Sequence, residues 1–160
     1  MQEIFAEYKT FIVFLHVISA VVWVGGMIAM RYAAHPSFME IESPAKRLER
    51  IAHALKRLFT IVLPFVIILI LTAVVMIKGY SLSQSEYSAF SHAKEGIWSV
   101  MFINLIVMMK RRNRSEKMLD EGDFVGAKNQ LELIGKYMVP LNILLGITAI
   151  FIGSYFSSIL

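Results

Sequence analysis

The stretch LFTIVLPFVIILILTAVVMI, residues 58–77, runs for 20 residues without one Asp, Glu, Lys or Arg. A helix of roughly 20 apolar residues crosses a hydrocarbon core about 30 Å thick. Residues 11–30 and 138–157 form two further uncharged stretches of the same length. The sequence therefore predicts at least three transmembrane helices.

A fourth span is expected around 91–110. Its charge-free part, 96–109, is short, so a helix that crosses the bilayer has to begin near Ser91 and carry His92, Lys94 and Glu95 into the boundary region. The predicted fold is all-α, an integral membrane bundle of four transmembrane helices in one domain, 1–160. The expected spans are about 10–31, 57–79, 91–110 and 137–158.

Composition points to the same class. Hydrophobic residues make up 57% of the chain and charged residues 18%, with a mean hydropathy of +0.62, far more apolar than a soluble domain. The absence of cysteine excludes disulfides, thiolate metal sites and covalently attached haem. The first apolar stretch is too long for a signal-peptide core, so we expect it to remain as a span.

The basic residues predict the orientation. Six lie between Arg31 and Arg57 and seven between Lys110 and Lys136, which makes the loops 32–56 and 111–136 cytoplasmic and places both termini outside. Topology thus accounts for the net charge of +4, and no nucleic-acid partner is expected. The expected location is the cell inner (cytoplasmic) membrane, as a multi-pass protein whose partner is the lipid bilayer.

Several local signals refine this picture. Ser43-Pro44 predicts the start of a helix that leads into the second span, and Asp123 is a predicted N-cap. Pro64 and Pro140 are expected to kink their spans. Two asparagines deep in spans are expected to form hydrogen bonds between helices or, alternatively, to line a cavity. They are Asn104 and Asn142.

His16 is the only ionisable side chain of the first span, and such groups are costly in a membrane unless they function. At helical spacing it shares a stripe with Ser19, Trp23, Gly26 and Met30, whose small members would admit a flat ligand or a neighbouring helix. The alternative is a histidine that is hydrogen-bonded to another helix.

His92, Lys94 and Glu95 open the third span at the same outer level as His16, so both elements are expected to meet across the bundle. A neutral imidazole binds haem iron or copper, and His92 or a deprotonated Lys94 would supply a second nitrogen. The alternative is an interfacial cluster that reaches the head groups and ends the helix.

Two weaker patterns are left open. His35 and His53 flank the inner ends of the first two spans, which allows a second haem there, although His35-Pro36 is typical of a turn and His53 of a solvated or lipid-facing position. Methionine thioethers suit Cu(I) but more often fill gaps in a core. The relevant ones are Met27, Met30, Met76 and Met101.

The order of motifs resembles the HemJ-type protoporphyrinogen IX oxidases and the related CopD-like copper-resistance membrane proteins. The motifs are Leu15-His16-Val17-Ile18-Ser19 with Trp23 and Gly26, then Arg31 and His35, Leu48-Glu49-Arg50, Ser91-His92-Ala93-Lys94, and Pro140. The resemblance implies a b-type haem near the outer face, with His16 and Lys94 at the positions of the family's helix-one histidine and essential lysine. Two departures are Lys136-Tyr137-Met138-Val139 in place of an Asn-Glu pair, and a third helix without the later histidine and tyrosine. The stretch 122–127 looks closer to the CopD-like proteins.

The expected function is therefore haem b binding in electron transfer or porphyrinogen oxidation, with a porphyrin or quinone substrate. His16 and His92 are the predicted metal ligands, and Lys94 is the predicted catalytic residue. The predicted cofactor-binding residues are His16, Ser19, Trp23, Gly26, His92 and Lys94. CopD-like copper transport and an accessory role in a membrane complex are the alternatives, and a homodimer is left open.

Overall fold

The computed structural model describes the backbone of residues 2–79 and 88–159 and the side chains of 5–79 and 95–155. These residues form helices and no strand, which confirms the all-α prediction. The chain makes four long helical rods. They are α1 (Gln2–Ala29) with the π-helical turn η1 (Met30–Ala34) and α2 (His35–Met39); α3 (Pro44–Gly79); α4 (Ser88–Asp120); and α5 (Phe124–Leu133) with the π-helical turn η3 (Ile134–Met138) and α6 (Val139–Ile159).

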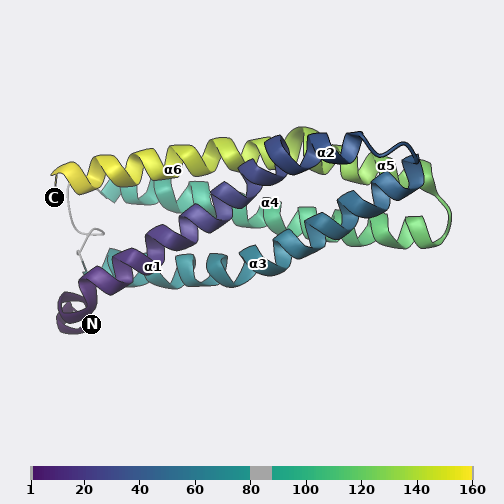
Figure 1. Ribbon diagram of the computed structural model, residues 1–160. Helices are drawn as coiled ribbons and strands as arrows, with labels where there is room; N and C mark the ends of the chain where they lie inside the picture. Colours follow the sequence, from purple (N-terminus) through teal and green to yellow (C-terminus); the bar gives the residue numbers. More distant parts are fainter. Residues whose placement is uncertain (1, 80–87, 160) are drawn as a thin grey trace.

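The rods lie side by side, with successive rods antiparallel (Figure 1). α1 packs against α3 and α6, α4 packs against α3, α5 and α6, and α3 also contacts α5. α1 begins and α6 ends at the same end of the bundle (Figure 1). We call this the outer end, and the end formed by α2 and α5 the inner end, after the orientation that the sequence predicts.

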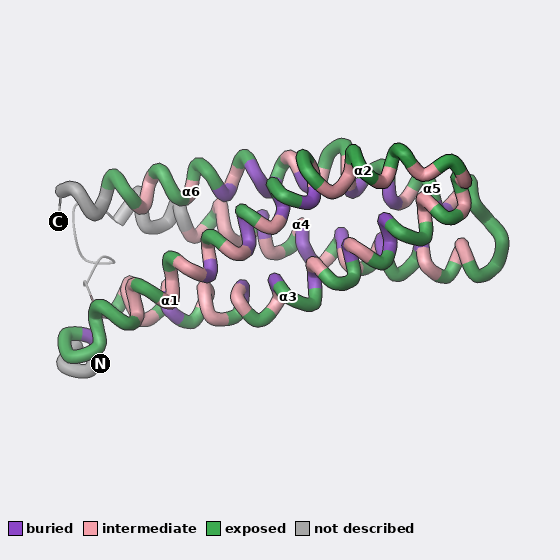
Figure 2. The backbone as a smooth tube through the Cα atoms, in the orientation of Figure 1, coloured by how far each residue is buried: buried purple, intermediate pink, exposed green. Residues whose placement is uncertain are grey.

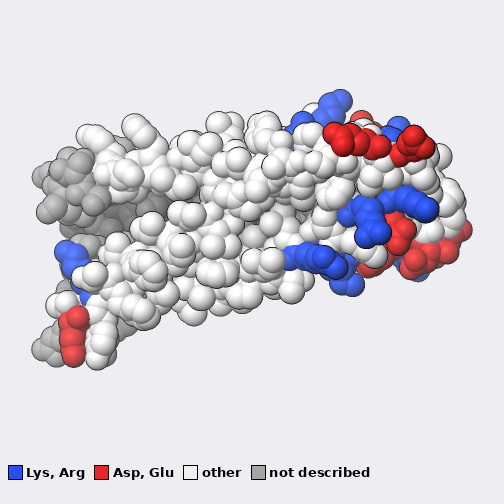
Figure 3. Space-filling view, viewed as in Figure 1, with Lys and Arg blue, Asp and Glu red and all other residues white. Residues whose placement is uncertain are grey.

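Three helical segments are long and apolar enough to cross a membrane by length and composition: Phe5–Met39, Pro44–Gly79 and Phe124–Tyr155. Buried positions face the middle of the bundle and exposed ones face outward (Figure 2). Many outward side chains are large and apolar, such as Phe11, Leu71 and Leu144. Charged side chains gather at the two ends and leave an uncharged band between them (Figure 3). These features indicate a membrane protein.

The helix starts predicted at two positions are confirmed. α3 begins at Pro44, and the Arg47 guanidinium donates to the Ile41 carbonyl from Nε and Nη2, at 3.0 and 2.7 Å. Asp123 caps α5, because its carboxylate accepts from the Gly126 amide at 2.8 Å. Gly122, just before the cap, has a φ of 80°, a conformation that glycine adopts without a steric penalty.

The turn predicted at His35-Pro36 is wrong, because the chain stays helical there through Met39. A proline ring inside an α-helix collides with the carbonyl four residues earlier. For Pro36 that carbonyl belongs to Tyr32, which lies in the wider turn η1, and for Pro140 it belongs to Lys136, which lies in η3. Each π-helical turn thus precedes a proline that the helix accommodates.

The predicted hydrogen bonds of the two asparagines are confirmed. Asn104 donates from Nδ2 to Asn142 Oδ1 at 2.7 Å and to the Met138 carbonyl at 2.8 Å. Asn142 in turn donates to the Met101 carbonyl at 3.3 Å. Both residues therefore bind α4 to the rod that contains η3 and α6 in the middle of the bundle, where lipid offers no competing partner.

Gly146 of α6 lies where this helix approaches α1 closely. A Cβ at Gly146 would lie 2.5 Å from Val24 Cγ2, whereas one at Gly25 would meet nothing within 4 Å. Gly146→Ala should destabilise the protein by roughly 1–2 kcal/mol, because overpacking outweighs the gain in helix propensity. Gly25→Ala, the matched control, should leave stability unchanged or raise it. Thermal midpoints in detergent measure both, and equal midpoints would contradict the close approach of α1 and α6.

Candidate functional site

His16, on α1, is held by a threonine of α3. Its Nδ1 lies 2.9 Å from Oγ1 of Thr72, which is buried with 7% of its surface exposed. The single hydroxyl proton of Thr72 is directed to carbonyls of its own helix, at 2.8 Å from Ile68 O and 3.0 Å from Leu69 O. With the hydroxyl proton placed there, Thr72 Oγ1 accepts from His16 Nδ1, and the tautomer assigned on this ground has its lone pair on Nε2.

This tautomer suits a metal ligand. A neutral imidazole binds haem iron or copper through a nitrogen lone pair, and a hydrogen bond on the other nitrogen fixes the ring and raises its basicity. The sequence left two roles open for His16, a ligand or a hydrogen bond between helices. The hydrogen bond to Thr72 uses Nδ1, so it is compatible with a ligand role for Nε2. Thr72 itself was not among the predicted residues, because a lone threonine in a span is common in any membrane helix.

Two predicted cofactor-binding residues lie in packed surroundings. Ser19 is fully buried, and its hydroxyl donates to the Leu15 carbonyl of its own helix at 2.7 Å. A Cβ at Gly26 would lie 3.0 Å from Leu58 Cδ1, so this glycine is where α1 and α3 approach closely. The sequence predicts that the small residues of this stripe admit either a flat ligand or a neighbouring helix. Gly26 admits the neighbouring helix α3.

Trp23 is a buried residue with an unsatisfied polar atom. Only 1% of its surface is exposed, and its indole Nε1 finds no hydrogen-bond partner within the described part of the chain. An unpaired buried donor costs about 1–3 kcal/mol, so an acceptor from a ligand or a bound water is expected beside it. Trp23 lies two helical turns inward of His16 on the same rod.

The predicted partners on the third span are placed only by their backbone. His92 and Lys94 belong to the first turns of α4, which begins at Ser88, but their side chains lie outside the described residues. The meeting of His16 with His92 or Lys94 thus stays a prediction. Among the described residues, no group of three or more His, Asp or Glu side chains is arranged to hold a metal ion.

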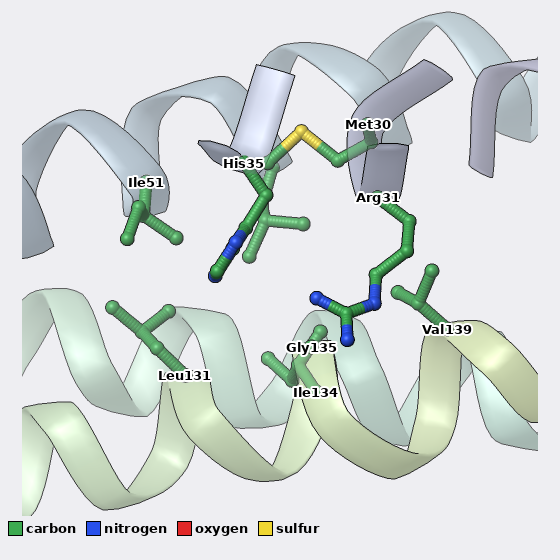
Figure 4. Close-up of a pocket in the computed structure, with 9 residues that line it drawn as sticks. Met30, Arg31, His35, Ile51, Leu131, Ile134, Gly135 and Val139 are labelled. Carbon is green, nitrogen blue, oxygen red and sulfur yellow. The ribbon is translucent and has the colours of Figure 1, made fainter. Parts of the chain in front are cut away.

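A small pocket lies between the two π-helical turns at the inner end. Arg31 and His35 point into it from one side, and Ile134 and Gly135 of η3 lie opposite (Figure 4). It encloses about 20 Å³, room for one water molecule. His53 is exposed on α3 and does not line this pocket. This pocket, formed by described residues, is too small for a haem, and the second haem considered for His35 and His53 stays a prediction.

Arg112 of α4 is a buried cation at the inner end, with 2% of its surface exposed. It donates from Nε to the Ala52 carbonyl of α3 at 2.9 Å, from Nη1 to Asn113 Oδ1 at 3.0 Å and from Nη2 to Glu116 Oε1 at 2.7 Å. The hydrogen bond from Arg112 is the main cause that lowers the pKa of Glu116, and the charges of Arg112, Lys56 and His53 add to it. This network ties α3 to α4.

Comparison with protein families, with curated proteins and with solved structures finds no match to this chain. The resemblance to the HemJ-type and CopD-like proteins therefore remains a prediction. The described geometry that bears on function is that of His16, Thr72 and Trp23.

Proposed function

We propose that this protein binds haem b in a membrane and acts in electron transfer or in porphyrinogen oxidation of the HemJ type. The observation that carries the proposal is the His16 imidazole, set in an apolar helix with Nδ1 bonded to Thr72. Bound haem would supply a one-electron redox centre. The residues of this chain would hold it, exclude water and move protons.

The proposal gives each residue a role. His16 would bind the iron through Nε2, and Thr72 would hold the ring in place. The Trp23 indole N–H would donate to a buried acceptor, which accounts for its unsatisfied state. Lys94 would be the catalytic residue, and His92 or Lys94 the second nitrogen donor.

The packing favours an outer position for the haem. Inward of His16, the bundle is closed by fully buried side chains of facing rods, among them Met27, Val62 and Leu105. The donor chemistry of His16 therefore fits a haem at the outer end of the bundle, and the closed core leaves no room for a porphyrin farther in.

A membrane arrangement of four spans belongs to the same proposal. α4 packs between α3 and α6, and its residues 96–109 carry no charge, so it would cross beside the three apolar rods. The bases of the inner end would face the cytoplasm, and both termini would face outward. The inner membrane of the cell is the proposed location.

An absorption spectrum of detergent-purified protein, oxidised and reduced, tests the proposal. We expect a Soret band that shifts on reduction, and a pyridine haemochrome assay that counts one haem b per chain. Protein without a Soret band, even after haem is supplied to the cells and to the sample, would overturn it.

The same preparation distinguishes the alternatives. Colourless protein that binds Cu(I) stoichiometrically would favour the copper-handling role, and a stable co-purifying partner without haem or copper would favour an accessory role. The described structure supports the copper role less, because Met27 and Met101 are buried in the packed core, where thioethers fill gaps.

A further inference from the structure

A groove of about 410 Å³ lies between α3 and α4 at the inner edge of the uncharged band. Its volume is in the range of small-molecule sites in proteins, about 300–1,000 Å³. The haem proposal makes no use of it. It is lined by Lys56, Phe59, Thr60, Leu63, Pro64, Ile67, Met109, Arg112 and Asn113.

The groove has two chemically distinct parts. Phe59, Leu63 and Ile67 follow one another at intervals of one helical turn along α3, so they form an apolar wall that runs along the rod into the uncharged band. Lys56 and Asn113 lie at its inner end, where the charge-free stretches of both helices stop. A ligand with a long apolar part and a polar head would match this arrangement of an apolar wall and a polar end.

The polar end favours an anion. Its charged groups are Lys56, Arg112 and the adjacent Glu116, and their charges sum to one positive unit. Arg112 uses three of its five N–H donors within the protein and is only 2% exposed, so it attracts an anion through its charge more than through a direct contact. The Lys56 side chain is 61% exposed and its Nζ lies 3.8 Å from Glu116 Oε1, a long contact. Lys56 can therefore reach a phosphate at the mouth of the groove.

We propose that this groove binds one anionic phospholipid of the inner leaflet. Its phosphate would lie beside Lys56 and Asn113, and one acyl chain would follow the wall of Phe59, Leu63 and Ile67. Basic pockets between membrane helices select anionic head groups, because each nearby Lys or Arg attracts their negative charge. A zwitterionic lipid has no net charge and is attracted less. The inference rests on α3 and α4 lying in a membrane, but not on haem.

Native mass spectrometry of the full-length protein tests this inference, after exchange into detergent with phosphatidylglycerol or phosphatidylcholine of identical chains. We expect one phosphatidylglycerol to be retained in preference to phosphatidylcholine. Lys56→Gln should weaken that binding about fivefold. Lys128→Gln, which removes an exposed lysine of α5 outside the groove, is the matched control and should bind as the wild type does.

A second variant tests the apolar wall. Leu63→Trp should lower phosphatidylglycerol retention without any change of charge, because the larger ring fills the groove. Equal retention of both lipids, equal effects of Lys56→Gln and Lys128→Gln, or full retention by Leu63→Trp would each overturn the inference. Displacement of the lipid by inorganic phosphate would also overturn it, because a free anion would then be the preferred occupant.

Discussion

The His16→Ala variant should be purified without the Soret band that the wild-type protein is expected to show. The variant removes Nε2, the atom that would bind the haem iron, and residues 11–30 contain no other ionisable side chain. Haem content by pyridine haemochrome should fall from about one per chain to the background level. Circular dichroism and elution volume, measured on the same sample, should show that the helical bundle is retained.

Thr72→Val separates a ligand role of His16 from a structural one. The variant keeps Nε2 but removes the hydrogen bond at Nδ1, so haem should still bind, with an affinity about tenfold lower and a shifted reduction potential. His53→Ala, on the exposed side of α3, should leave the spectrum unchanged. Full haem content in His16→Ala would refute the proposed ligand, whatever the effect of Thr72→Val.

The sequence predicted the features that depend on local chemistry. Uncharged stretches of about 20 residues marked the three apolar rods, because charged side chains are costly in lipid and are therefore absent from membrane spans. Ser43-Pro44 and Asp123 marked helix starts, because caps and prolines act within one turn. Asn104 and Asn142 were correctly expected to form hydrogen bonds between helices, since deep polar groups in adjacent spans have few other partners.

The features that the sequence did not reveal depend on which side of a helix a residue faces. Arg112 lies in a run with Arg111 and Arg114, and only packing against Ala52 makes it the buried member. Thr72 matters because its register places it opposite His16. The π-helical turns were missed because a proline after an apolar segment equally predicts a turn, as it did at His35-Pro36.

Arg112→Ala should destabilise the protein by roughly 2–3 kcal/mol. The change removes the hydrogen bonds that the guanidinium donates to the Ala52 carbonyl and to the Glu116 carboxylate, and it leaves a void between α3 and α4. We place the effect below that of a fully buried pair because 32% of the Glu116 side chain is exposed to water. Thermal or denaturant midpoints in detergent measure the loss. Arg114→Ala, an exposed position of the same run, removes the same charge and should change the midpoint little.

The pH dependence of this loss identifies the part that comes from Glu116. The hydrogen bond from Arg112 holds the pKa of Glu116 below its usual value of 4.5, so the folded state prefers the ionised carboxylate. That contribution is fully present above pH 4.5 and disappears as the pH falls through the lowered pKa. The difference in stability between the wild type and Arg112→Ala should therefore shrink as the pH is lowered from neutrality into the acid range. A difference that stays constant would mean that the bond to Ala52 and the packing of the guanidinium carry the whole effect, and Glu116→Gln should then be as stable as the wild type.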